Sequence, residues 1–124
     1  MHTTKIVEVG SLVEEFAAEY LMILFGQQVP PELKDICVVH DNHETAKNVI
    51  KTGDILTIGN QEYEIKEVGS EANHNFEPLG HISIYFRTGE NEVLPGAIVV
   101  EPQIFPEFAI GGYHPIWRTT IRSR

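Results

Sequence analysis

The sequence predicts a mainly β protein, a small barrel-like single domain that spans residues 1–124 and contains one or two short helices. Short apolar or β-branched runs recur at roughly ten-residue spacing with glycine or proline turns between them, which is typical of small barrels and sandwiches. A chain of 124 residues with 42% hydrophobic residues is large enough for one core. Its single cysteine, Cys37, excludes an internal disulfide, and we expect it to be buried.

Each expected strand is a short apolar or alternating run that ends at a turn signal. In Gln61–Val68, Tyr63 and Ile65 alternate with charged neighbours, as in a sheet with one wet face. The pair Gly59-Asn60 before it predicts a tight hairpin turn. The expected strands are, in chain order, Lys5–Val9, Leu21–Phe25, Ile36–His40, Ile55–Ile58, Gln61–Val68, His81–Phe86, Ala97–Val100 and Ile116–Ile121.

Helical signals are few. Ser11 followed by Glu14 is a capping-box pattern, which predicts a short helix over Leu12–Glu19. Pro31 is well placed to begin a helical turn. The polar stretch Gly69–Gly80 is expected to be a loop or a single helical turn.

The charge and the apolar runs limit the classes of partner. A net charge of -9 argues against an electrostatic grip on nucleic acid and suits a partner with a basic face. The longest apolar run, Tyr20–Phe25, is far shorter than the ~20 residues that span a bilayer. The first ten residues lack the apolar core of a signal peptide. We therefore expect a cytoplasmic protein.

The first candidate functional residue is His40, which ends an apolar strand and precedes a polar segment that contains His43 and Glu44. A strand of this kind is expected to deliver the imidazole to a surface cleft, where it can act as nucleophile, base or metal ligand. His81 follows Gly80, which permits close backbone approach, so His81 is expected either beside His40 or as an inert strand start. No function is assigned to the other histidines, His2, His74 and His114.

Two chemistries compete for His40. In the first, His40, His43, Glu44 and His81 bind a metal in a cupin-like small barrel enzyme or sensor, although their spacing matches neither the cupin pattern nor His-Glu-x-x-His. In the second, one neutral nitrogen of His40 attacks a phosphoryl group while a hydrogen bond to the other nitrogen fixes the tautomer. Donors such as Asn42 or His81 would spread the phosphoryl charge. A third hypothesis is that the protein is a binding module that carries out no reaction and is not covalently modified.

The sequence lacks a Gly-Lys-Ser phosphate-binding loop, so in the second reading the phosphoryl group arrives on a partner protein. Several motifs, taken in their order and spacing, favour this second hypothesis. They are Cys37-Val38-Val39-His40, Gly59-Asn60-Gln61-Glu62-Tyr63, Val68-Gly69-Ser70, Leu79-Gly80-His81-Ile82 and Leu94-Pro95-Gly96. Together they resemble the glucitol/sorbitol-specific IIA components of the bacterial phosphoenolpyruvate:sugar phosphotransferase system.

The resemblance implies a phosphocarrier that takes a phosphoryl group from the phosphocarrier protein HPr and passes it to the IIB component of a sugar permease. It implies that His40 is the phosphoryl acceptor, that His81 supports it, and that neither a cofactor nor a metal is needed. It also implies a small barrel-like fold and a membrane association that is only peripheral, through the IIB and IIC components. A second histidine of some relatives falls at Asn42, which leaves His43 without an implied function. The sequence leaves a homodimer, the hexitol and the phosphorylated nitrogen of His40 open.

Overall fold

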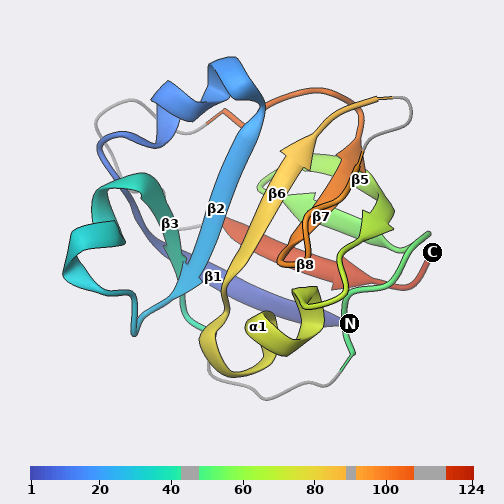
Figure 1. Cartoon of the computed structure of the whole chain (residues 1–124), viewed down its shortest axis with the longest axis horizontal. Helices are drawn as coiled ribbons and strands as arrows, with labels where there is room; N and C mark the ends of the chain where they lie inside the picture. The colour runs from blue at the N-terminus through green and yellow to red at the C-terminus, as the bar shows by residue number, and fades with distance from the viewer. Residues whose placement is uncertain (43–47, 89–91, 108–116) are drawn as a thin grey trace.

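The computed structural model describes residues 1–42, 48–88, 92–107 and 117–124, and the strands in them form a closed barrel (Figure 1). The strand order around the barrel is β1-β3-β2-β6-β7-β5-β4-β8. This confirms the predicted fold class, and every expected strand is present within a few residues of its expected bounds. The strands are β1 (His2–Val9), β2 (Leu21–Gly26), β3 (Cys37–His40), β4 (Ile55–Ile58), β5 (Gln61–Val68), β6 (Ile82–Phe86), β7 (Ala97–Glu101) and β8 (Arg118–Arg122).

β3 is buried on both faces, and this explains its unbroken apolar sequence. Val38 belongs to the main core inside the barrel, whereas Cys37 and Val39 pack with Phe25 in a second cluster on the opposite face. Leu33, from the short helix before β3, helps to cover that cluster. Because side chains alternate along a strand, His40 points to the same side as Val38, into the barrel.

The two short 3₁₀ helices are η1 (Val13–Glu19) and η2 (Pro31–Ile36). η2 begins at Pro31, as predicted. The capping box expected for η1 is wrong, because the helix is capped at Leu12 without a side-chain hydrogen bond. No helix among the described residues has the length and hydropathy needed to span a bilayer.

The stretch expected to be a loop or single turn contains the helix α1 (Ala72–Leu79). Its sequence is a poor helix former with Pro78 near its end, but Ala72 and Phe76, four residues apart, are both buried in the core. The Asn73 side chain also exchanges two hydrogen bonds with the backbone of Ile50, at 3.0 and 2.9 Å. Tertiary packing therefore overrides the low intrinsic propensity.

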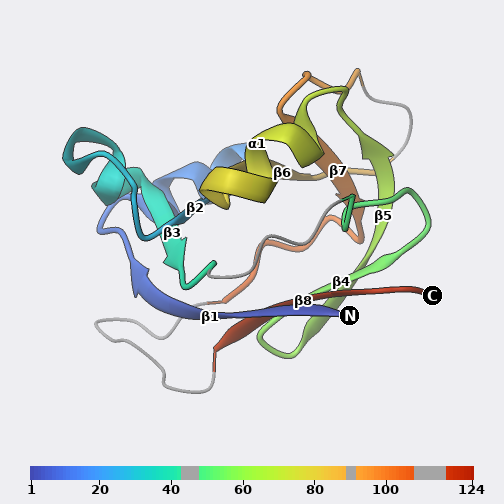
Figure 2. The same cartoon turned by 90° about the horizontal axis from the view of Figure 1, so that it is seen from below.

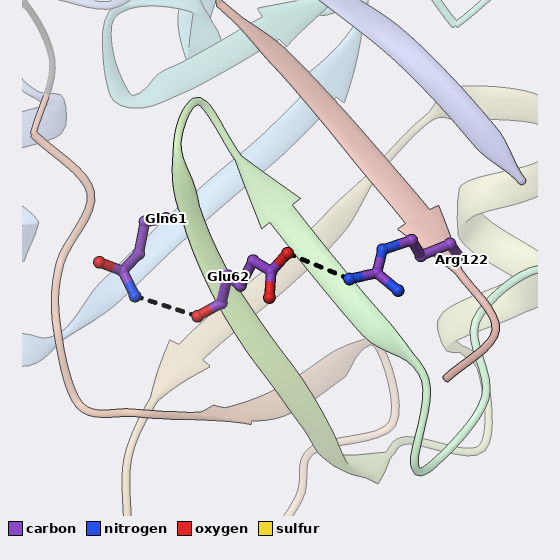
Figure 3. A network of polar contacts seen from close by, with 3 residues as sticks. All are labelled: Gln61, Glu62 and Arg122. Atoms are coloured by element: carbon purple, nitrogen blue, oxygen red, sulfur yellow. Dashed lines mark hydrogen bonds and ion pairs between the residues drawn. The ribbon is translucent and has the colours of Figure 1, made fainter.

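β8 closes the barrel, since it pairs with both β1 and β4. On the outer face of this seam, the Arg122 guanidinium lies 3.0 Å from the Glu62 carboxylate, and the Gln61 amide donates to the Glu62 carbonyl (Figure 3). Arg124 pairs with Glu64 in the same way. Exposed pairs of this kind contribute at most about 1 kcal/mol, so hydrogen bonding and burial hold the seam together.

Candidate functional site

His40 is fully buried, with 0% of its surface exposed, so in the described part of the chain it does not reach a surface cleft as expected. Its backbone is fixed on both sides, because it lies opposite Ile6 of β1 and Gly26 of β2. α1 and the turn that leads into β6 lie at the end of the barrel where β3 ends (Figures 1 and 2). The carbonyl of Gly80 in this turn contacts the ring. The Phe76 ring stacks on the imidazole with 5.9 Å between centroids.

Two glycines let the turn after α1 approach the barrel this closely. Gly80 caps α1 with a φ of 62°, and a Cβ there would lie 2.7 Å from Nε2 of His40. A Cβ at Gly26 would lie 2.7 Å from the carbonyl oxygen of Leu79. The expectation that Gly80 permits close backbone approach is confirmed.

The hydrogen bonds of the His40 ring define its tautomer. Nε2 lies 2.9 Å from the carbonyl oxygen of Gly80, and because a carbonyl can only accept, Nε2 carries a proton. Nδ1 lies 2.6 Å from Oγ1 of Thr4. In a neutral ring Nδ1 is then the acceptor, and the Thr4 hydroxyl donates to it.

The Thr4 hydroxyl has a second partner at 2.6 Å, the hydroxyl of Thr119 on the neighbouring strand. Thr4 and Thr119 face one another in the β1–β8 register. Since Thr4 donates its proton to His40, Thr119 donates to Thr4. The resting direction of the chain is therefore Thr119 to Thr4 to His40 to Gly80.

Burial keeps the ring neutral. Desolvation lowers the pKa of His40 to about 4, and the hydrogen bond to Gly80 and the charge of Asp41 only partly oppose it. At neutral pH the imidazole is therefore uncharged, the state in which a ring nitrogen can act as a nucleophile.

A second buried histidine, His2, lies on β1 two residues before Thr4. His2 is buried in β1, although no function was expected for it. Its Nε2 donates to Oδ1 of Asn42 at 3.2 Å, and the Asn42 amide donates to the carbonyl of Phe76. His2 and Thr4 lie on the same strand face as the core residue Ile6, because side chains alternate along a strand. This spacing of two is the sequence signal that could have indicated their burial.

The ring of His81 does not meet His40 in the way expected of a second imidazole. It stacks on Phe25, with 4.3 Å between centroids and 17° between planes, while the preceding carbonyl contacts His40. The side chain is partly exposed, and burial lowers its pKa. His74 is exposed, whereas His43, Glu44 and His114 lie outside the described residues.

The metal set expected for a cupin-like barrel is not supported. Within the described ranges, no group of three or more His, Cys, Asp or Glu side chains is arranged to hold a metal ion. Both ring nitrogens of His40 are already hydrogen-bonded to other groups. Fold and site together define a small β-barrel protein that holds a neutral histidine at the end of a buried strand.

Comparison with known proteins identifies the family. The family described as PTS system glucitol/sorbitol-specific IIA component matches residues 1–113, and the chain belongs to it. The glucitol/sorbitol-specific EIIA components of Shigella flexneri and Escherichia coli K12 are each 28% identical over 112 residues, covering 90% of this chain and 89% of theirs. The crystal structure of a PTS system IIA component from Enterococcus faecalis V583 superposes with a TM-score of 0.76 at 26% identity, covering 98% of both chains.

These findings confirm the resemblance inferred from the sequence motifs. As a member of this family the chain is a component of a phosphotransferase system. The cupin-like alternative, whether enzyme or sensor, finds no support in them.

Proposed function

We propose that the protein is a phosphocarrier that accepts a phosphoryl group from phospho-HPr on His40 and passes it to the IIB component of a glucitol/sorbitol permease. The observation that carries the proposal is the imidazole of His40, which burial keeps neutral at the end of β3. A neutral imidazole is the form that attacks phosphorus. Family membership supports the partners and a cytoplasmic location, with membrane contact only through the permease.

The accepting atom in this proposal is Nε2. Nδ1 faces Thr4, whose strand β1 is paired on both sides with β3 and β8, so no group can reach Nδ1 without opening the barrel. Nε2 faces Gly80, in the short turn between α1 and β6. This turn can withdraw without breaking a strand pairing, and its withdrawal would expose Nε2.

We assign His81 a supporting function at this opening. It is the residue after Gly80, it is partly exposed, and its stack on Phe25 limits the orientations of its ring. With its pKa lowered, the neutral ring offers one N–H donor, suited to an equatorial oxygen of the incoming phosphoryl group. Asn42 lies close by and is a second candidate donor.

The net charge of -9 supports a transient encounter with a donor whose docking face is basic, as the family resemblance implies for HPr. Such a relay needs a contact that forms and breaks quickly, which electrostatic steering favours over a large apolar interface.

The test is intact-mass measurement after incubation with phosphoenolpyruvate, enzyme I and HPr. Wild type should gain one acid-labile phosphoryl group, and His40→Ala should gain none. His40→Gln is the better-matched variant, because its amide can still donate to the Gly80 carbonyl and so limits the loss of folding. Phosphoryl acceptance by either variant would remove His40 from this function.

A further inference from the structure

We propose that the hydroxyls of Thr119 and Thr4 form a proton wire that switches His40 from its resting tautomer to the one that reacts, which makes Thr4 a positioning residue for phosphoryl acceptance. This inference rests on the proposed function of His40. It concerns how the ring becomes reactive, and the evidence lies in the direction of the hydrogen bonds around it.

The resting ring cannot attack through Nε2. Nε2 carries the proton that it donates to Gly80, and its lone pair is delocalised in the ring. The reactive tautomer carries its proton on Nδ1 instead and therefore needs a hydrogen-bond acceptor at Nδ1. Among the described residues, the group hydrogen-bonded at that position is the Thr4 hydroxyl, at 2.6 Å.

A hydroxyl can serve both tautomers, because it is a donor and an acceptor on one rotatable bond. In the resting chain Thr4 donates to Nδ1 and accepts from Thr119. In the reversed chain it accepts from Nδ1–H and donates to Thr119. The two 2.6 Å distances suit either direction, and the β1–β8 register holds both oxygens in place.

The reversal balances with water as the proton carrier. Thr4 gives its proton to Nδ1, Thr119 gives its proton to Thr4, and water gives a proton to Thr119, which leaves hydroxide in solvent and a transient imidazolium in the site. When the Gly80 turn withdraws, the proton on Nε2 passes through solvent to that hydroxide, so water is restored and the ring is neutral again. The Nε2 lone pair then forms the bond to phosphorus as the P–N bond of the donor breaks, and that electron pair returns to the donor nitrogen.

The small number of buried polar side chains supports a function for the hydroxyls of Thr4 and Thr119. In the part of the chain that the structure describes, the buried polar side chains are His2, Thr4, His40 and Thr119. Three of these four, Thr119, Thr4 and His40, form one hydrogen-bonded chain. It enters the His40 ring at Nδ1 and continues from Nε2 to the Gly80 carbonyl. The Thr4 hydroxyl satisfies the buried Nδ1 of His40, whereas the Thr119 hydroxyl is bonded to another hydroxyl, at a position that valine could fill without a polar group to satisfy.

The seam between β1 and β8 offers a matched control. Thr3 and Thr120 also face one another in the register, with their hydroxyls 3.3 Å apart, but on the exposed side of the strands. Thr3→Val therefore makes the same chemical change in the same two strands without touching His40. Thr4→Val cuts the wire at His40, Thr119→Val cuts it one step away, and Thr4→Ser keeps the hydroxyl.

The experiment measures the rate of phosphoryl acceptance from phospho-HPr for these four variants, together with the ¹⁵N shifts of the His40 ring in the unphosphorylated protein. Thr4→Val and Thr119→Val should be about 10- to 100-fold slower, the cost of a buried donor left without an acceptor, whereas Thr4→Ser and Thr3→Val should be close to wild type. In wild type the ring should show a protonated Nε2 and a bare, hydrogen-bonded Nδ1.

The outcomes separate this inference from the function on which it rests. A wild-type protein that accepts no phosphoryl group overturns the proposed function. A wild type that accepts it while Thr4→Val and Thr119→Val are equally fast overturns the wire alone, as does a resting ring protonated at Nδ1. If Thr4→Val does not fold, Thr119→Val and the wild-type ring shifts still decide.

Discussion

The carbonyl oxygen of Gly80 lies 2.9 Å from Nε2 of His40, and this one contact both fixes the tautomer of the ring and covers the nitrogen that we propose as the phosphoryl acceptor. In our proposal the closed arrangement is the resting state. At Nε2 the imidazole is covered by the backbone of the turn, and the Phe76 ring stacks on its face. In our proposal, phosphoryl acceptance depends on how easily that turn withdraws, which requires no strand pairing of the barrel to break.

The tight fit of Gly80 against His40 can be tested with alanine. Gly80→Ala places a Cβ 2.7 Å from Nε2 of His40 and forces alanine to a φ of 62°. Gly53→Ala is the matched control, because Gly53 has a φ of 92° but nothing within 4 Å of the added Cβ. The control should cost about 1–2 kcal/mol of unfolding free energy from backbone strain alone. Gly80→Ala should cost about 1–3 kcal/mol more, from overpacking. Equal losses in urea unfolding would contradict the close packing of the turn.

The buried neutral state of His40 predicts a loss of stability in acid. The pKa of about 4 in the folded protein lies below the ordinary histidine value of 6.5, so between these values the unfolded chain binds a proton that the folded protein does not. The free energy of unfolding should therefore fall as pH falls from about 6.5 to about 4, by about 3 kcal/mol in total for this residue.

The matched variant for this measurement is His40→Gln, which cannot take up the proton. Denaturant unfolding at a series of pH values should show the difference between wild type and variant shrinking as the pH falls through this window. His81, whose pKa burial also lowers, contributes in the same direction in both proteins and cancels in the comparison. A difference that does not change with pH would mean that His40 titrates normally in the fold.

The supporting function of His81 can be separated from its packing. His81→Phe should keep the stack on Phe25 and remove the ring nitrogens, whereas His81→Ala should lose both. We expect His81→Ala to be about 0.5–1.5 kcal/mol less stable than His81→Phe, the value of an aromatic pair. Both should accept the phosphoryl group about 10²-fold more slowly than wild type, because both lack the N–H donor. A His81→Phe protein as fast as wild type would leave His81 with a packing function only.

The strands could be predicted because their signals are local. Alternation in β5, the Gly59-Asn60 turn and the apolar run of β3 each lie within a few consecutive residues, and the structure follows them. α1 could not be predicted in the same way, since its stability comes from Phe76 in the core and from Asn73 bound to the distant Ile50.

The candidate site was predictable only in part. His40 follows from its position at a strand end, but its burial depends on Gly80, 40 residues further along the chain. Its partner chain depends on Thr4 and Thr119, which are 115 residues apart and meet only because β8 closes the barrel against β1. No local pattern carries that pairing, although each inward-facing threonine shares its strand face with a buried isoleucine two residues later, Thr4 with Ile6 and Thr119 with Ile121.

The most direct test of the account is the position of the phosphoryl group in the modified protein. The protein, with ¹⁵N-labelled histidine, would be phosphorylated through phosphoenolpyruvate, enzyme I and HPr, and its ring nitrogens observed by NMR. The account predicts that phosphorus couples to Nε2 of His40, that the signals of the Gly80 turn shift, and that the other histidines remain unmodified. Coupling at Nδ1, coupling at any other histidine, or no modification with active partner proteins would contradict it.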